Sequence, residues 1–394
     1  MVRRRTIRFI RKTLGCICIS VLIREVKTEI PIDMSAKRTK ITSPACFVGM
    51  DGNGIISFGS GQPDLPPPKE IFENVANKRL FRYGLIKGDI NLREALSKQY
   101  PNAGPEDFVI TNGASEALDL VFRAIHQMYG KVKVLVCRPY YYSYLPIIEL
   151  AGLEPVYTDL KEGKIDIRDF EEKIKSVKAV LINSPSNPTG RVEEIATLHA
   201  IERIAAKLGV YVISDEVYKD LIYERENYLI KGRHVITINS FSKTYSMCGL
   251  RIGYLFAQDP RIVERVVGLK VHTSMNTNVI AQEMALRATR VPRSLVARQT
   301  AIWKQRRDYI YGEMLAMGFD LWKPEGAFYV LPKIRNSGRV VEDLYYDHKI
   351  IVYDGAWFGA PGRIRLSYAL KLSKIREGLS RIGEYLKGRG NWLA

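Results

Sequence analysis

The sequence is poor in the two residue types that most often build metal sites and disulfide frameworks. Only five cysteines and five histidines occur among 394 residues. Cys137 ends the apolar segment "KVKVLVC", where a reduced, buried thiol is expected. Cys16 and Cys18 lack the second pair that a structural zinc site needs, and the histidines show no ligand spacing. The sequence therefore argues against a disulfide-stapled fold and indicates no metal.

Long apolar runs are also missing. The run from Thr13 to Ile23 follows a basic start and resembles the core of a signal peptide, but it is shorter than the roughly 20 residues that span a bilayer. No small-residue cleavage site follows it. Our preferred interpretation is that translation begins at Met34, and an uncleaved membrane-associating tail is the alternative. We therefore expect a cytoplasmic protein without membrane attachment.

Acidic residues are outnumbered by basic ones. The chain has 60 Lys and Arg against 42 Asp and Glu, a net charge of +18. These charges are mostly interspersed, as in "LKLSKIREGLSRIGEYLKGRG", which has the pattern of an amphipathic helix with a basic, solvated face. No RNA-binding aromatic signature or zinc-finger spacing accompanies them. The composition thus favours a basic surface or acidic small ligands over nucleic acid.

Strand-like and helix-like segments alternate from about residue 105 onwards. Amphipathic stretches such as "GASEALDLVFRAIHQM" and "VEEIATLHAIERIAAKLG" separate apolar runs of strand type. There are seven such runs: "DFVIT", "KVKVLVC", "EPVYTD", "VKAVLIN", "VYVIS", "HVITINS" and "RIGYLFA". This alternation predicts an α/β protein with a mostly parallel, seven-stranded sheet covered by helices on both faces. After about Val291 the pattern changes to a long basic helix, short strands and a final helix, which predicts a second, smaller α/β domain.

Chemically distinctive residues follow several of these strands. A Gly-Ala-Ser sequence opens a helix in "NGASEAL", Asp215 ends a strand in "SDEVY", and Lys243 and Arg251 follow another in "NSFSKTYSMCGLRIGY". Each has a structural explanation too, because small residues cap helices and Asn-Pro and Thr-Gly form turns. Ligands of such sheets, however, bind at the carboxyl ends of the strands. An anion cradle, a carboxylate and a lysine at one edge fit pyridoxal 5'-phosphate.

A resemblance to a known family extends over most of the chain, from about Ile55 to the C-terminus. Motifs occur in the family's order: "FGSGQPDLPPP", "YGLIKGDINLREAL", "NGASEAL", "SPSNPTG", "SDEVY", "SFSKTYSMCGLRIGY", "PEGAFYVLP" and "RIRLSYA". With them the sequence resembles the fold-type I, class I/II aminotransferases, particularly the group that contains the aspartate aminotransferases. The basic residues 1–33 form a separate N-terminal extension, which the preferred start at Met34 would remove. For the rest of the chain we expect an arm over 34–60 that joins the small domain, a large cofactor-binding domain over 61–290 and a small domain over 291–394.

The resemblance also implies roles for the residues at the centre of the site. Lys243 would hold pyridoxal phosphate as a Schiff base and shuttle the reacting proton. Asp215 would pair with the ring nitrogen of the cofactor. Asn187 and Tyr218 would hydrogen-bond its phenolic oxygen.

The remaining cofactor contacts are implied in the same way. Tyr141 matches the aromatic residue stacked on the ring face. Tyr83 matches a tyrosine that reaches the phosphate bound by a neighbouring subunit, so a homodimer is expected. The phosphate-binding residues would be Ala114, Ser115, Ser240, Ser242 and Arg251.

The substrate contacts rest on the same resemblance. Arg365 in "RIRLSYA" matches the arginine that grips the substrate α-carboxylate, with Arg363 as the competing candidate. Gly61 would bring its backbone close to the substrate, and Asn187 would touch the carboxylate. For a second, distal carboxylate the weak candidates are Lys270 and His272.

Together these features predict an aminotransferase that works by ping-pong half-reactions on amino acids and 2-oxo acids. Aspartate is the expected amino donor and 2-oxoglutarate the expected acceptor. Alanine or aromatic donors remain open, as does a related lyase that cleaves C–S bonds by β-elimination. A non-enzymatic regulator with the same fold is a remote alternative, since 33 N-terminal residues are too few for a DNA-binding domain.

Overall fold

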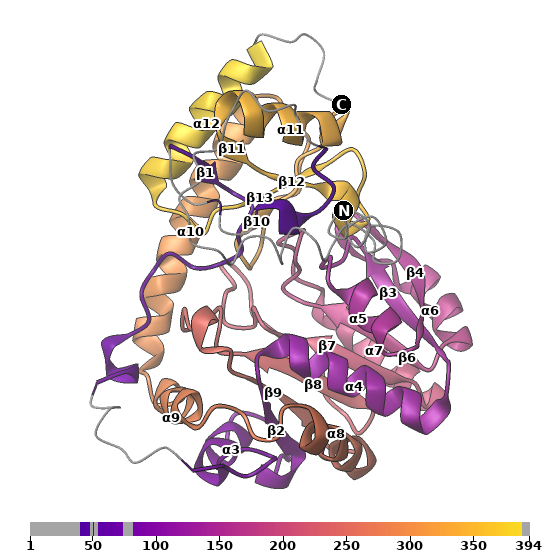
Figure 1. Ribbon diagram of the computed structural model, residues 1–394. Helices are drawn as coiled ribbons and strands as arrows, with labels where there is room; N and C mark the ends of the chain where they lie inside the picture. Colours follow the sequence, from indigo (N-terminus) through magenta and orange to yellow (C-terminus); the bar gives the residue numbers. More distant parts are fainter. Residues whose placement is uncertain (1–39, 48–49, 51–53, 74–81, 388–394) are drawn as a thin grey trace, which may run out of the picture.

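The computed structural model describes residues 40–47, 50, 54–73 and 82–387 (Figure 1). The expected extension over residues 1–33 lies outside this range, and the domain boundaries given above remain predictions. No helix in the described part of the chain is both long and apolar enough to cross a bilayer.

A mostly parallel sheet forms the centre of the larger part of the molecule. Its strand order is β2-β9-β8-β7-β6-β3-β4-β5. The strands are β2 (Phe108–Thr111), β3 (Lys133–Arg138), β4 (Glu154–Lys161), β5 (Lys164–Ile165), β6 (Ala179–Asn183), β7 (Tyr211–Asp215), β8 (Val235–Ser240) and β9 (Gly253–Ala257). Neighbours from β8 to β4 pair in parallel, whereas β9 is antiparallel to both β8 and β2. The predicted α/β architecture is confirmed, with one difference: the sheet has eight strands, because the two-residue β5 adds to the seven expected from the sequence.

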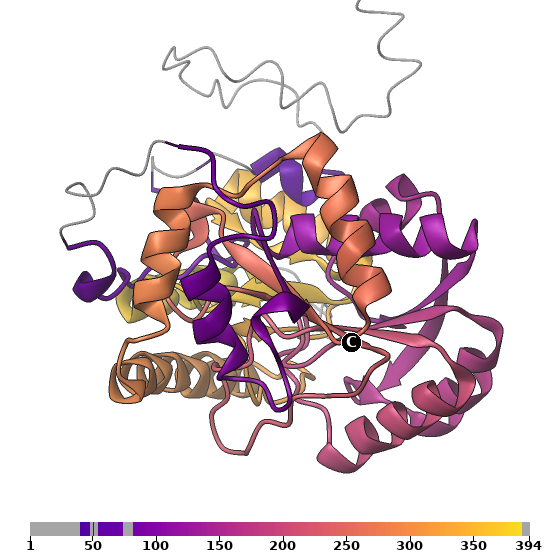
Figure 2. The same cartoon turned by 90° about the horizontal axis from the view of Figure 1, so that it is seen from below.

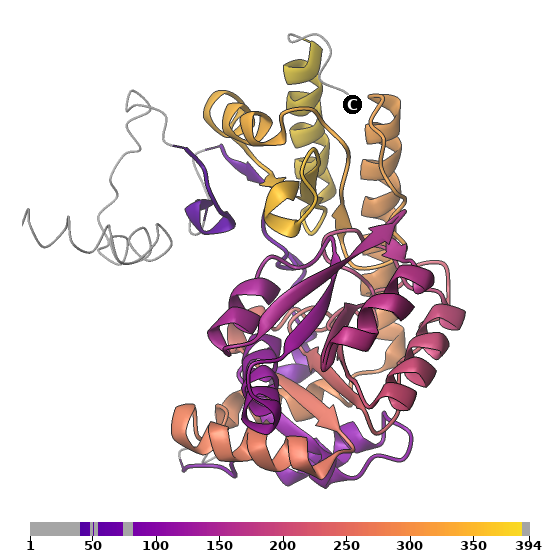
Figure 3. The same cartoon turned by 90° about the vertical axis from the view of Figure 1, so that its right-hand side faces the viewer.

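Helices cover both faces of this sheet, as Figures 2 and 3 show. Along β3, Val134 and Val136 face one core, while Leu135 and Cys137 face the other, as the two-residue period of a strand requires. The first core includes α4 (Ala114–Tyr129), α5 (Tyr144–Leu150) and α8 (Pro260–Thr273). The second includes α6 (Ile167–Lys173) and α7 (Ile195–Leu208). A third core joins β2 and β9 to α3 (Ile90–Ser97) and α9 (Val279–Ala288).

The C-terminal elements form a second group with its own apolar core. This group contains the three-stranded sheet β10-β13-β12 and the helices α10, α11 and α12. The elements are β10 (Tyr329–Val330), β11 (Ile350–Ile351), β12 (Tyr353–Asp354), β13 (Ile364–Ser367), α10 (Arg293–Ala316), α11 (Ser337–His348) and α12 (Leu372–Lys387).

An N-terminal strand belongs to this second group. Strand β1 (Ile56–Ser57) pairs in parallel with β11, and Phe58 continues the contact by donating its N–H to the Ile351 carbonyl at 2.8 Å. In Figure 1 the chain then passes from the C-terminal group down towards the large sheet. The residues after β1 are thereby held between the two groups of elements.

Candidate active site

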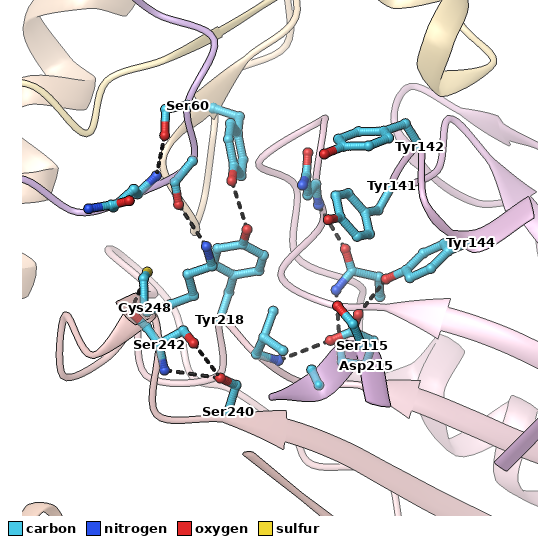
Figure 4. Close-up of a pocket in the computed structure, with 18 of the residues that line it drawn as sticks. Ser60, Ser115, Tyr141, Tyr142, Tyr144, Asp215, Tyr218, Ser240, Ser242 and Cys248 are labelled. Carbon is cyan, nitrogen blue, oxygen red and sulfur yellow. Dashed lines mark hydrogen bonds between the residues drawn. The ribbon is translucent and has the colours of Figure 1, made fainter. Parts of the chain in front are cut away.

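A cavity of about 290 Å³ lies where the strands of the large sheet end against the C-terminal group (Figure 4). Twelve residues predicted from the sequence line it: Gly61, Ala114, Ser115, Tyr141, Asn187, Asp215, Tyr218, Ser240, Ser242, Lys243, Arg251 and Arg365. The thirteenth, Tyr83, lies outside the cavity and is 85% exposed. Thus residues scattered over three hundred positions meet at one sheet edge.

Lys243 lies three residues beyond the end of β8 and lines the cavity. Its Nζ donates a hydrogen bond to the Gly61 carbonyl at 2.7 Å. Desolvation lowers the pKa of the Lys243 amine, and the nearby charges of Arg365 and Arg251 act in the same direction. A lowered pKa raises the fraction of neutral amine, which is the nucleophilic form.

Asp215 is the last residue of β7 and is 4% exposed. Its Oδ2 accepts a hydrogen bond from the Tyr144 hydroxyl at 2.6 Å, and its Oδ1 accepts one from the Val217 N–H at 3.2 Å. Burial raises the pKa of Asp215 to about 6, although these bonds and the charge of Lys243 act against the rise. A carboxylate held this way is suited to pair with a positively charged ring nitrogen. Such a partner would favour the ionised form of Asp215.

Arg365 lies on β13 and reaches the cavity from the C-terminal group. One guanidinium nitrogen, Nη1, donates to the Asn187 Oδ1 at 2.9 Å, and Nη2 donates to the Gly59 carbonyl. The guanidinium carbon lies 4.5 to 4.8 Å from three ring centroids, those of Tyr329, Tyr353 and Phe358. Its buried Nε has no hydrogen-bond partner among the described residues. A buried, partly unsatisfied guanidinium is a ready ligand for a carboxylate.

Three candidates raised by the sequence lie elsewhere. Arg363 packs on the Trp322 ring at 4.0 Å and donates to the Leu331 carbonyl at 2.8 Å, outside the cavity. Its backbone continues the line of β13 through a bridge to Lys333, but Trp322 and the Leu331 carbonyl hold its guanidinium away from the cavity. Lys270 is buried and pairs with Glu116 at 3.1 Å, and His272 is exposed on α8. Neither residue lines the cavity.

A cluster of hydrogen-bond donors surrounds the first turn of α4. The helix begins at Ala114, directly after Gly113, whose φ of 80° few other residues adopt readily. The first amides of a helix lack intrahelical partners. The hydroxyls of Ser240 and Ser242 lie 2.7 Å apart, and an ideal Cβ on Gly113 would lie 2.5 Å from the Arg251 Nη2. Amides, hydroxyls and a guanidinium around a helix N-terminus form a donor set that fits a phosphate dianion.

Several lining residues were not singled out from the sequence. Tyr144 holds Asp215, and Tyr329 accepts or donates a 2.7 Å hydrogen bond with the Tyr218 hydroxyl. Asn183 donates to the Asp215 carbonyl at 2.8 Å and accepts from the Asn187 N–H at 2.8 Å. Tyr144 lies in the tyrosine-rich segment "RPYYYSY" and Tyr329 in the motif "PEGAFYVLP", so both could have been noticed in the sequence. Their hydrogen-bond partners could not, because these depend on the fold.

The arrangement of lysine, carboxylate and anion cradle at the carboxyl edge of a mostly parallel sheet defines a pyridoxal-phosphate type of site. Residues 53–382 match the family described as aminotransferase class I and II. The chain therefore belongs to this family and is a pyridoxal-phosphate-dependent aminotransferase.

Individual relatives agree with this assignment. The aspartate aminotransferase of Thermotoga maritima is 33% identical over 92% of this chain and 98% of its own. The aromatic-amino-acid aminotransferase 2 of Thermococcus litoralis is 30% identical over 85% of this chain and 92% of its own. The solved aspartate aminotransferase of Thermus thermophilus with maleate superposes with a TM-score of 0.80 at 28% identity, covering 84% of this chain and 91% of that one.

Proposed function

We propose that the cavity binds pyridoxal 5'-phosphate and moves an amino group from an amino acid, aspartate in the first instance, to a 2-oxo acid such as 2-oxoglutarate. The observation that carries the proposal is the convergence of Lys243, Asp215 and Arg365 on one cavity. An amine, a buried carboxylate and a carboxylate-binding guanidinium are the three groups that this reaction needs from the protein.

The residues around the cavity divide into contacts for separate parts of the cofactor. The first amides of α4, with Ser115, Ser240, Ser242 and Arg251, would hold the phosphate. The Tyr141 ring would cover one face of the pyridine ring, and Asp215 would accept a hydrogen bond from its protonated nitrogen. The amide of Asn187 and the hydroxyl of Tyr218 would hold the phenolic oxygen. Burial raises the pKa of Tyr218 well above its ordinary value, so this hydroxyl stays protonated and able to donate.

When bound, pyridoxal phosphate supplies an electron sink that stabilises negative charge at the substrate α-carbon. Lys243 would attach the cofactor at its aldehyde and afterwards carry the proton that leaves the α-carbon. Its lowered pKa favours both roles, because each needs the neutral amine. Asp215 would keep the ring nitrogen protonated, and Tyr144 would hold Asp215 in place.

The substrate α-carboxylate would bind to Arg365, whose position is fixed by Asn187 and the Gly59 carbonyl. The unpartnered Nε and the surrounding rings favour this anion, since a charged hydrogen bond is stronger where water is excluded. Gly61 lies close by, and its carbonyl already meets Lys243. Aspartate as the donor is supported by the names of the relatives, which include aspartate enzymes and one aromatic-amino-acid enzyme.

The proposal includes a homodimer in which Tyr83 reaches the phosphate bound by the other subunit. Tyr83 is 85% exposed and Leu85 is 58% exposed in the single chain. Met275, in the loop between α8 and α9, is 44% exposed. Exposed aromatic and aliphatic side chains of this size are typical of an interface.

The test is an absorbance titration of the purified, cofactor-loaded protein with single amino acids. We expect aspartate to change the visible spectrum of the bound cofactor and 2-oxoglutarate to restore it. Formation of pyruvate and ammonia from a sulfur-containing amino acid would instead indicate elimination. A protein that never develops a cofactor spectrum would refute the proposal.

A further inference from the structure

An ion pair between a fully buried lysine and a partly buried glutamate lies behind the anion cradle. Lys270, on α8, has a fully buried side chain, and its Nζ lies 3.1 Å from the Glu116 Oε2. Ser274 accepts a second hydrogen bond from the same Nζ at 2.7 Å. Helix α8 packs along α4, and both helices contribute to the same core (Figure 1). A lysine charge this deeply buried is costly unless an oppositely charged group pairs with it. The role of the pair therefore depends on where Glu116 lies.

Glu116 is the third residue of α4, one position beyond Ser115. Its carboxylate turns back and accepts the Asn112 N–H at 2.5 Å and the Asn112 side-chain amide at 3.1 and 3.2 Å. In a capping box, an acidic residue at the third helical position accepts a hydrogen bond from the backbone N–H of the N-cap residue. Glu116 makes the equivalent contact one residue earlier, with Asn112. Glu116 thereby fixes the turn Asn112-Gly113 that leaves the next amides free for an anion.

The cap introduces a charge of the wrong sign. Burial alone would raise the pKa of Glu116, but hydrogen bonds from Ser274, Asn112 and Lys270 outweigh burial and lower it. A carboxylate in the first turn of α4 stabilises the helix, yet it repels a phosphate dianion bound at the same terminus. Lys270 is the cation that faces this carboxylate from the neighbouring helix.

We infer that Lys270 is a positioning residue for the cofactor phosphate: it neutralises Glu116, so that the capped terminus of α4 can accept a dianion. This inference rests on the proposed function, because it assigns the cradle to phosphate. It predicts that removal of the lysine charge weakens phosphate binding specifically, without contact between Lys270 and the ligand.

The experiment compares two ligands that bear no aldehyde, pyridoxamine 5'-phosphate and pyridoxamine, by fluorescence titration of the apo protein. In Lys270→Met the affinity for the phosphorylated ligand is expected to fall about 10- to 100-fold, the range of couplings between neighbouring groups. The affinity for pyridoxamine is expected to change by less than about twofold, since no phosphate is involved. In the double variant Lys270→Met/Glu116→Gln the preference for phosphate should return.

Controls separate this role from a merely structural one. Arg93 on α3 is another buried cation, and it pairs with Glu106 at 2.7 Å. Arg93→Met should lower stability without changing the ratio of the two affinities. Should Lys270→Met fail to fold, Glu116→Gln keeps the test open. It leaves the lysine charge unopposed and should raise the preference for the phosphorylated ligand.

Equal losses for both ligands in Lys270→Met, or a preference that Glu116→Gln leaves unchanged or lowers, would overturn the inference. A wild-type protein that binds neither ligand would instead refute the proposed function. The two failures are therefore distinguishable.

Discussion

Lys243 shows how a single residue acquires its chemistry from neighbours that are remote in sequence. Its amine meets the Gly61 carbonyl at 2.7 Å, a contact across 182 positions of the chain. The guanidinium groups of Arg365 and Arg251 help to lower its pKa. Burial is the largest cause of this lowering, so the reactivity proposed for Lys243 depends on its enclosure in the cavity.

Replacement of Lys243 by alanine is therefore expected to abolish covalent attachment of the cofactor and to slow amino transfer by about 10³-fold or more. The measurement combines the visible spectrum with single-turnover rates. Lys219→Ala is the matched control, because Lys219 pairs with Asp220 at 3.4 Å outside the cavity. Near-normal turnover of the Lys243 variant would show that another group moves the proton.

Glu216, next to Asp215, is expected to make stability depend on pH. It is 2% exposed, its Oε1 accepts the Ser214 hydroxyl at 3.0 Å, and its Oε2 has no partner among the described residues. Burial raises the pKa of Glu216 to about 8 from an ordinary 4.5. Between these values the folded state binds more protons than the unfolded state, so this group lowers stability as the pH rises.

Glu216→Gln should remove that dependence. We expect the variant to gain up to about 4 kcal/mol over the wild type at pH 8 and no more than about 1 kcal/mol at pH 5. Urea unfolding at fixed protein concentration measures both values. Glu226→Gln, at an exposed position of the same segment, should show no such trend. A gain that is equal at both pH values would contradict the ionisation argument.

At the scale of elements, the N-terminus of α4 illustrates the division between local and tertiary control. The motif "NGASEAL" predicted a helix start that binds an anion. Gly and Ser before an amphipathic segment mark a helix start, and this signal lies entirely in neighbouring residues. The position of Arg251 beside Gly113 is set by the 3-10 turn Cys248–Leu250, which precedes it, and by β9, which begins two residues later. The sequence therefore predicted the cradle, but the fold determines how closely its two sides meet.

Gly113→Ala tests this closeness. The substitution places a Cβ 2.5 Å from the Arg251 Nη2 and at a φ of 80°. We expect the affinity for pyridoxamine 5'-phosphate to fall about tenfold or more, in addition to a cost of about 1–2 kcal/mol in stability from the backbone conformation.

Gly130→Ala is the control at the other end of the same helix. Its φ is 72°, and nothing lies within 4 Å of an added Cβ. It should lose similar stability and keep the affinity for the cofactor. Equal affinities for the two variants would mean that Arg251 does not contribute to the cradle.

At the scale of the whole molecule, the cavity draws on both groups of elements. Lys243 and Asp215 come from the large sheet, and Arg365 and Tyr329 come from the C-terminal group. The segment after β1 closes the space between them with Gly59 and Gly61. Movement of one group against the other would therefore change the site, which neither group contains alone.

The proposed homodimer predicts complementation between inactive subunits. Tyr83→Ala should lose activity through weaker phosphate binding, and Lys243→Ala through loss of the amine. In a mixed dimer, one site would combine an intact Lys243 from one subunit with an intact Tyr83 from the other. Activity that appears on mixing the two variants, and in neither alone, is the expected result. Full activity of Tyr83→Ala by itself would exclude the proposed role.

Contiguous residues determined much of this protein by themselves. The alternating strands and helices, the helix start at Ala114 and the strand-end positions of Asp215 and Lys243 follow from periodicity and from neighbouring residues. They were predicted for this reason, and the α/β fold that they imply is confirmed.

Only the tertiary structure decided the remaining features. It paired Tyr144 with Asp215, placed Arg365 in the cavity and Arg363 on Trp322, and turned Lys270 towards Glu116 instead of a substrate. It also added β5, whose two residues are too few to show a strand period. These outcomes depend on contacts between residues far apart in the chain, whose distances no local pattern contains.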